Sequence, residues 1–209
     1  MGSLREKFNQ VPFIALTATA DRTTRQDIID KLHFHEPKVH ISSFDRPNIR
    51  YKVLEKHNPM KQLLGFLEGH QNQSGIVYAL SRKRVEEVAE KLKDEGINAK
   101  AYHAGLPAQI RHSVHQQFIR DEVDIVVATV AFGMGIDKPN VRFVVHYDLP
   151  KNIEGYYQET GRAGRDGLPS EALLLFGMQD VATAKHFVEN VADENQRRLE
   201  NFKLSSMVD

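Results

Sequence analysis

Short apolar runs alternate with amphipathic segments along most of the chain. The apolar runs predict strands over Phe13–Leu16, Val39–Ile41, Ile49–Leu54, Ile76–Leu80, Ile97–Tyr102, Ile125–Ala128, Val141–Val145 and Ala172–Phe176. The segments between them predict helices over Thr23–Leu32, Met60–Glu68, Arg82–Asp94, Pro107–Arg120, Ile153–Thr160 and Asp180–Val191. Apolar strands separated by helices are typical of a parallel sheet that is covered on both faces. The pattern therefore predicts an α/β fold.

Two of these helices carry clear starting signals. Ser81 is placed to cap the helix that begins at Arg82, and Pro107 suits the first turn of the next helix. Within the first of the two, four apolar residues recur at helical spacing and predict the face that packs on the sheet: Val85, Val88, Ala89 and Leu92.

The ends of the chain depart from this regular alternation. Residues 36–48 contain two prolines and several polar residues, which suits a linker, and they place a domain boundary near residues 42–47. We therefore expect residues 1–41 to be the end of a preceding domain and residues 42–192 to form one α/β domain. Residues 193–209 are expected to be a charged helix that leads toward a further region.

The composition narrows the classes of function. Lys and Arg total 28 and Asp and Glu total 28, so the net charge is zero and any contact with a polyanion must come from local patches. The chain has no cysteine, which excludes disulfides, thiolate zinc sites and a cysteine nucleophile. No apolar run approaches the length of a membrane span, so no membrane partner is expected.

Three short patterns resemble metal sites, and none is expected to bind a metal. His33 and His35, and likewise His112 and His115, have no third ligand at a fitting spacing, so we interpret them as surface histidines. The acidic run of residues 121–124 precedes its strand, which places it at the end of the sheet opposite to a magnesium site.

The densest candidate chemistry lies in residues 158–167, Gln-Glu-Thr-Gly-Arg-Ala-Gly-Arg-Asp-Gly. Arg162 and Arg165 are three residues apart among three glycines, and Gln158 precedes the first arginine by four residues. Guanidinium groups stay ionised and match phosphate oxygens two at a time, so such a loop can stabilise charge during phosphoryl transfer. The alternative is an arginine-rich helix end whose charges pair with Glu154 and Glu159 on the surface.

A second candidate loop follows the predicted strand Ile125–Ala128. Thr129 offers a hydroxyl at the strand end, and Gly133 and Gly135 allow backbone N–H groups to face an anion. Asp137 can accept hydrogen bonds from a ribose or pair with a cation. The alternative is a tight loop whose glycines only satisfy backbone geometry.

Further polar residues follow other strands, where ligands of open parallel sheets bind. Tyr78, Ser81 and Arg82 lie where the strand Ile76–Leu80 meets its helix, and His103 and Gly105 lie at the end of the next strand. Hydroxyls, guanidinium groups and N–H groups at helix starts commonly hold backbone phosphates. His103 by itself is better interpreted as a structural histidine.

Thr17 and Thr19 stand between the first predicted strand and its helix. Two hydroxyls at such a turn can couple a nucleotide site to another site. The alternative is that Thr19 or Thr23 simply caps the helix. No Gly-x-x-x-x-Gly-Lys-Ser/Thr phosphate loop occurs in the chain, so it should not hydrolyse ATP alone. The arginines are then expected to act in a site that another domain completes.

Together these residues resemble those of bacterial RecQ DNA helicases. The resemblance rests on Thr17-Ala-Thr-Ala20, on residues 43–51 (Ser-Phe-Asp-Arg-Pro-Asn-Ile-Arg-Tyr), on residues 128–142 and on residues 156–167. The run Gly-Met-Gly-Ile-Asp-Lys-Pro-Asn-Val-Arg, beside Phe-Asp-Arg-Pro-Asn, distinguishes RecQ from other helicases of superfamily two.

The resemblance implies a motor of two RecA-like domains that hydrolyses ATP in their cleft and moves 3′ to 5′ on single-stranded DNA. This chain would be the second domain, with residues 1–41 ending the first. Thr17 and Thr19 would belong to a coupling motif, and residues 78–82 and 129–137 would contact DNA and nucleotide. Gln158, Arg162 and Arg165 would form the arginine-finger motif, with Arg165 at the γ-phosphate.

Cofactors and partners follow from the same resemblance. ATP and Mg²⁺ would be shared with the first domain, whose phosphate loop, acidic motif and aromatic-rich DNA-sensing loop would precede residue 1. A zinc site and a winged helix would follow residue 209. Expected partners are single-stranded DNA, DNA junctions and a single-stranded-DNA-binding protein, in a bacterial cytoplasm around the nucleoid, with roles in recombination and repair.

Two other functions remain open at this point. The chain could be the C-terminal domain of an RNA helicase, or a non-catalytic module that only holds nucleic acid.

Overall fold

The parallel sheet predicted from the apolar runs is present in the second of two units into which the chain divides, Met1–Asp45 and Arg46–Asp209. The structure is a computed structural model, and it describes residues 7–8, 11–17, 20, 22–34, 36–41, 45–133, 136–189, 194 and 197. Each unit is described by itself below.

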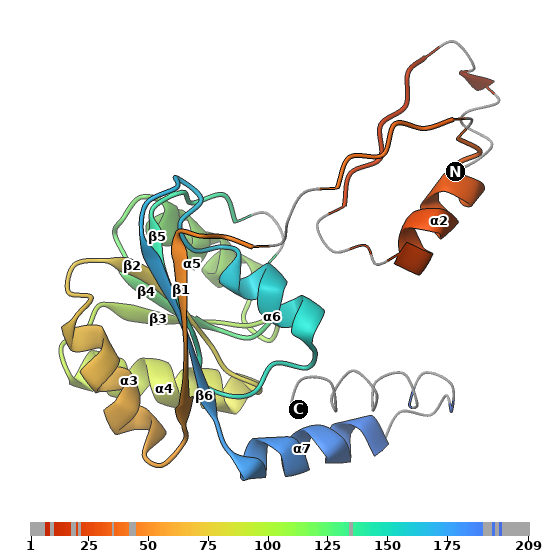
Figure 1. Cartoon of the computed structure of the whole chain (residues 1–209). Helices are drawn as coiled ribbons and strands as arrows, with labels where there is room; N and C mark the ends of the chain where they lie inside the picture. The colour runs from red at the N-terminus through yellow and green to blue at the C-terminus, as the bar shows by residue number, and fades with distance from the viewer. Residues whose placement is uncertain are drawn as a thin grey trace. The chain divides into compact units, whose positions relative to one another are not determined.

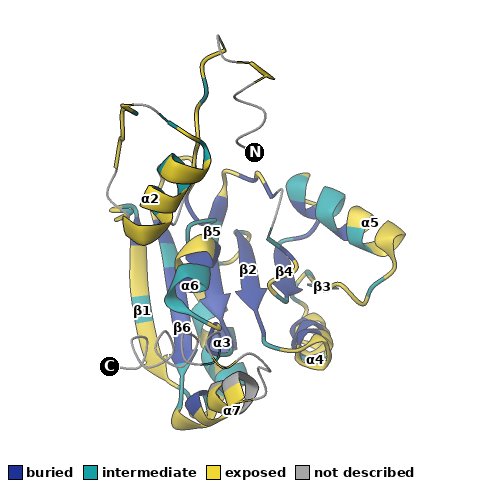
Figure 2. Ribbon diagram, turned by 90° about the vertical axis from the view of Figure 1, so that its right-hand side faces the viewer, coloured by how far each residue is buried: buried dark blue, intermediate teal, exposed yellow. Residues whose placement is uncertain are grey.

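The second unit is built on six strands, all parallel to their neighbours (Figure 1). In chain order they are β1 (Ile49–Glu55), β2 (Ser74–Tyr78), β3 (Ala99–Tyr102), β4 (Ile125–Ala128), β5 (Val141–His146) and β6 (Ser170–Phe176). Their order across the sheet is β1-β6-β5-β2-β4-β3. The central strands β2 and β4 are buried along their whole length, whereas the edge strand β1 is mostly exposed (Figure 2).

Helices cover both faces of this sheet. On one face, α3 (Pro59–Glu68) and α4 (Arg82–Asp94) pack on Val77, Val127, Val145 and Leu173. On the other face, α5 (Ala108–Ile119) packs near β2 and β4, and α6 (Ile153–Thr160) packs near β6. The helix α7 (Met178–Glu189) follows β6. The predicted α/β fold is confirmed.

The starting signals of the helices act as the sequence indicates. Ser81 Oγ accepts a hydrogen bond from Arg84 N at 3.2 Å and caps α4, whose predicted apolar face is buried. Asn58 and Asn152 cap α3 and α6 in the same way. Pro107 lies at the cap position of α5 and not inside its first turn.

Two predicted strands are wrong. Phe13–Leu16 and Val39–Ile41 have no strand structure in the first unit, where α2 (Arg22–Lys31) is the main regular element of the described residues. A strand requires a neighbour for its backbone hydrogen bonds, and none is described for either segment within Met1–Asp45. Their apolar residues Ile14, Leu16 and Ile41 are instead exposed.

The predicted helix over residues 193–209 lies outside the described residues except for residues 194 and 197. None of the helices in the described part of the chain is long and apolar enough to cross a membrane.

A buried lysine fixes the segment that enters β5. The side chain of Lys138 is 1% exposed, and its Nζ donates to Asp121 Oδ1 at 2.6 Å. The same oxygen accepts from Ser74 Oγ at 3.1 Å and from Asn140 Nδ2 at 3.2 Å. The hydrogen bond from Lys138 holds the pKa of Asp121 below its usual value. The acidic run of residues 121–124 therefore contributes a structural anchor.

This anchor should make stability depend on acid pH. Because the pKa of Asp121 is lower in the folded state than in the unfolded chain, its contribution is present at neutral pH and is lost as pH falls below about 4. Asp121 is largely exposed, but its partner Lys138 is buried. Asp121→Asn keeps an acceptor oxygen and loses the charge, so it should cost about 1–3 kcal/mol at pH 7. Urea unfolding at pH 7 and pH 3 measures this cost, with the exposed Asp94→Asn as control. An equal cost at both pH values would contradict the assignment.

Candidate functional site

The two candidate arginines lie in a loop that begins where α6 ends, residues 161–167, called here the arginine loop. Two side chains just before β1, those of Arg46 and Asn48, hold its backbone. Arg46 Nη2 donates to Gly164 O at 2.9 Å and to Ala163 O at 3.4 Å. Asn48 Nδ2 donates to Gly164 O at 2.8 Å and to Leu168 O at 3.0 Å. The Phe-Asp-Arg-Pro-Asn motif thus supports the arginine loop from more than 100 residues away.

The start of β5 holds the other side of this loop. Gly164 N donates to Val141 O at 2.8 Å, and Arg142 Nη2 donates to Asp166 Oδ2 at 2.6 Å. This hydrogen bond holds the pKa of the Asp166 carboxyl below its usual value. Arg142 also donates to the carbonyl oxygens of Pro139 and Pro169. The backbone of the arginine loop is therefore fixed at several points. The side chains of Arg162 and Arg165 extend from this fixed backbone.

Arg162 and Arg165 both reach residues 129–137, called here the strand-end loop because it follows β4. Arg162 Nη1 donates to Gly133 O at 2.5 Å. A Cβ atom at Gly133 would lie 3.0 Å from Arg162 Nη2, so glycine permits this close approach. Arg165 Nη1 donates to Ile136 O at 2.9 Å and lies 3.3 Å from Asp137 Oδ1. The structure thus brings together the two loops that the sequence singled out separately.

The two arginines differ in exposure. The side chain of Arg165 is 38% exposed, and that of its partner Asp137 is 92% exposed. The Nε atom of Arg162 is buried and has no hydrogen-bond partner among the described residues. Arg165 is therefore the arginine that an external phosphate can reach, whereas Arg162 mainly joins the two loops.

The sequence also allowed the two arginines to form surface ion pairs with carboxylates of α6. Glu159 does not form such a surface pair. Its carboxylate is buried and lies 2.7 Å from His146 Nε2. Gln158 lies on the exposed side of α6. Gly135 falls outside the described residues.

A second group of predicted residues meets at the carboxyl ends of β2, β3 and β4. Ser81 caps α4, and Arg82 begins that helix with an exposed side chain. A Cβ atom at Gly105 would lie 3.0 Å from Arg82 Nη1, so these two residues are adjacent. Thr129 N donates to Tyr102 O at 3.2 Å, and this places Thr129 at the same edge of the sheet.

Tyr78 and His103 do not present their side chains at this edge. Tyr78 is buried and its hydroxyl donates to Phe132 O at 2.8 Å. Burial raises the pKa of Tyr78 above its usual value, and the positive charge of Arg162 opposes this shift. His103 is also buried, with Nε2 at 3.0 Å from Glu86 Oε1. Both side chains are held from inside by neighbouring groups, and the expected contact of these two residues with nucleic acid stays a prediction.

The remaining predicted residues lie in the first unit. Thr17 is exposed there, and Thr19 falls outside the described residues. Within the described residues, no group of three or more His, Asp or Glu side chains could hold a metal ion.

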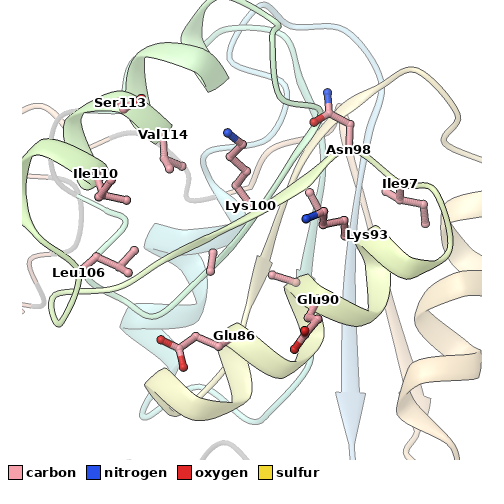
Figure 3. A pocket seen from close by; sticks show the side chains of 13 residues that line it. Glu86, Glu90, Lys93, Ile97, Asn98, Lys100, Leu106, Ile110, Ser113 and Val114 are labelled. Carbon is pink, nitrogen blue, oxygen red and sulfur yellow. The ribbon is translucent and has the colours of Figure 1, made fainter.

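Among the hollows on the described part of the second unit, two are large enough to hold a small molecule. One, of about 620 Å³, opens at the carboxyl ends of the strands, and Ser81, Arg84 and Asp148 are among its lining residues. At its floor, Lys56 Nζ lies 2.9 Å from both Asp148 Oδ1 and Asp180 Oδ1. The other, of about 570 Å³, lies between α4, β3 and α5 (Figure 3). None of the predicted site residues lines this second hollow.

Comparison with known proteins identifies the family to which the chain belongs. A model of the helicase conserved C-terminal domain matches residues 55–167, which is more than half of the chain. The chain is 52% identical to ATP-dependent DNA helicase RecQ of Pasteurella multocida, over 99% of this chain and 33% of that protein. It is 50% identical to ATP-dependent DNA helicase RecQ of Haemophilus influenzae, over 99% and 33% respectively. The chain thus spans about a third of the length of these curated relatives.

A solved structure supports the same assignment. A DEAD box protein from the hyperthermophile Methanococcus jannaschii is 26% identical, with a TM-score of 0.61 over 83% of this chain and 47% of that chain. The relatives confirm the resemblance to RecQ helicases, and the solved structure and the family model confirm the RecA-like fold class. The chain belongs to the family of the helicase conserved C-terminal domain, and it is similar to bacterial RecQ helicases over nearly its whole length.

Proposed function

We propose that this chain supplies the arginine-bearing side of an ATP-driven DNA helicase motor. The observation that carries the proposal is the arginine loop, which is held by Arg46, Asn48 and Arg142 and directs an accessible Arg165 beside the strand-end loop. In this proposal, residues 42–192 form the second RecA-like domain and residues 1–41 end the first. Residues 193–209 lead toward a further region.

Arg165 is proposed as the arginine finger. ATP, when bound between the two RecA-like domains, supplies the phosphoryl group that is transferred to water. Arg165 stabilises negative charge that develops on that group, exchanging its exposed contact with Asp137 for phosphate oxygens. The carbonyl of Ile136 keeps the guanidinium group in place during this exchange.

The other residues of the site have supporting roles in this proposal. Arg162 joins the arginine loop to Gly133, and Gln158 contributes from the exposed side of α6. Gly133, Gly135 and Asp137 form the part of the strand-end loop that faces the nucleotide. The motif for a phosphate loop is absent from the sequence, so phosphate and Mg²⁺ binding require the first domain. The chain alone is not expected to hydrolyse ATP.

The carboxyl ends of β2, β3 and β4 are the proposed contact surface for single-stranded DNA. Ser81, Arg82, Gly105 and Thr129 offer there a hydroxyl group, a guanidinium group and backbone N–H groups, which suit phosphate oxygens. These contacts read no base sequence, so the 3′-to-5′ direction and the DNA substrate rest on the similarity to RecQ helicases. Thr17 and Thr19 would couple the two domains.

The test is ATP turnover by the full-length protein that carries this chain. We expect single-stranded DNA to stimulate turnover strongly and single-stranded RNA of the same length to stimulate it weakly. Duplexes with a 3′ single-stranded end should be unwound, and duplexes with a 5′ end should not. Stimulation mainly by RNA would identify an RNA helicase, and binding without turnover would identify a non-catalytic module.

A further inference from the structure

A hydrogen-bonded pair of titratable side chains lies buried between the two functional surfaces. His146, the last residue of β5, and Glu159, in the last turn of α6, meet with Nε2 at 2.7 Å from Oε2. Their side chains are 1% and 10% exposed. The imidazole ring also lies against two aromatic rings, those of Tyr78 and Tyr156, with centroid distances of 5.4 Å and 4.9 Å.

Such a pair is poorly explained by stability alone. Taking polar groups out of water costs free energy that their mutual attraction only roughly offsets, and apolar side chains of similar volume often stabilise a fold equally well. A directional contact, however, fixes one geometry where apolar packing allows several. The position of the pair therefore indicates what its geometry serves.

On one side, the pair is tied to the proposed DNA surface. His146 pairs in register with Tyr78 of β2, and Tyr147 N donates to Tyr78 O at 2.9 Å. Two residues beyond Tyr78, Leu80 N donates to Asp148 Oδ2 at 3.0 Å. The segments that end β2 and β5 are thus hydrogen-bonded to each other, just before Ser81 and Arg82 in the chain.

On the other side, the pair is tied to the arginine loop. Arg162 N donates to Glu159 O at 3.2 Å, so the carboxylate and the first arginine belong to the same helical turn. Arg162 in turn donates to Gly133 O in the strand-end loop. A shift of the strand ends that reaches His146 would therefore reach the start of the arginine loop through one side-chain contact.

We propose that the His146–Glu159 pair transmits DNA binding at the ends of β2 and β5 to the position of the arginine loop. This inference rests on the proposed function of the chain. His146 and Glu159 are positioning residues, because neither side chain faces the proposed nucleotide or DNA surface. The pair links two sites through one rigid connection between a strand end and a helix end.

The experiment compares basal and DNA-stimulated ATP turnover in variants of the full-length protein. The double variant His146→Phe/Glu159→Leu replaces the pair by apolar side chains that keep the site filled and the protein folded. It should lower the stimulation by single-stranded DNA about tenfold, while basal turnover and the Kd for DNA stay within about twofold. Glu159→Gln keeps an oxygen that can accept from His146 Nε2, and it should retain most of the stimulation.

A matched control pair is available across β1 and β6. Lys52 Nζ lies 2.7 Å from Glu171 Oε2 on the two strands at one edge of the sheet, and Lys52→Met/Glu171→Leu should leave the stimulation unchanged. If the His146–Glu159 pair had only a structural role, its double variant would lower basal turnover, stimulated turnover and the Tm together. The inference is overturned if the double apolar variant keeps the wild-type ratio of stimulated to basal turnover.

Arg165→Ala separates this inference from the proposed function. Loss of stimulated turnover in Arg165→Ala, together with a normal ratio in the pair variants, would remove only the coupling role. Wild-type protein without DNA-stimulated turnover, or full turnover in Arg165→Ala, would remove the proposed function itself.

Discussion

Arg165→Ala in the full-length protein is expected to lower DNA-stimulated ATP turnover about 1,000-fold while the affinity for single-stranded DNA stays within about twofold. An arginine that stabilises transferring phosphate is worth about 10³–10⁵ in rate, and we take the lower end. DNA affinity is retained because Arg165 lies in the arginine loop, whereas the proposed DNA contacts lie at the ends of β2, β3 and β4. Steady-state turnover and fluorescence anisotropy with labelled DNA measure the two quantities.

Two further variants test the reason for this loss. Arg165→Lys keeps the charge but loses the planar fork that matches two phosphate oxygens, so it should recover only a small part of the rate. Arg120→Ala removes an exposed arginine at the end of α5 and should change neither quantity. Equal losses of turnover and DNA affinity in Arg165→Ala would contradict the finger role.

The regular elements of the second unit were predictable because their signals are local. The bounds of α4, α6 and β4 match the prediction at both ends, since a capping residue or a change of apolar pattern marks each boundary. The strands predicted over Phe13–Leu16 and Val39–Ile41 failed because an apolar run gives no information about its partner.

The site was only partly predictable for the same reason. Tyr78 was expected at the ligand-binding edge because it stands near the end of a strand. Side chains alternate between the two faces of a strand, and that of Tyr78 lies on the same buried face as Ile76. The contacts of Arg46 and Asn48 run to backbone carbonyls 115–120 residues away, which leave no side-chain pattern to read. The pairing of His146 with Glu159 likewise depends on the packing of α6 against the sheet.

Gly164→Ala should be the most damaging small substitution in the arginine loop. Gly164 has φ +59°, a left-handed conformation that costs other residues about 1–2 kcal/mol. A Cβ atom there would also lie 2.4 Å from Asn48 Nδ2, 2.7 Å from Ser170 Oγ and 2.9 Å from Leu168 O. Overpacking of this kind adds about 1–3 kcal/mol, so we expect a total loss of about 2–5 kcal/mol. For a chain of this size, the Tm should fall by roughly 10 °C.

Calorimetry or urea unfolding of the 209-residue chain measures this loss, and the same loop supplies the control. Gly167 has φ +81°, and a Cβ atom there would meet nothing within 4 Å. Gly167→Ala therefore isolates the backbone cost, about 1–2 kcal/mol, from the steric cost. The double variant Gly164→Ala/Asn48→Ala removes the most severe clash. Its loss of stability should therefore be smaller than the sum of the losses in the two single variants. Equal losses at Gly164 and Gly167 would show that the arginine loop yields to the added methyl group, and that Asn48 does not hold it rigidly.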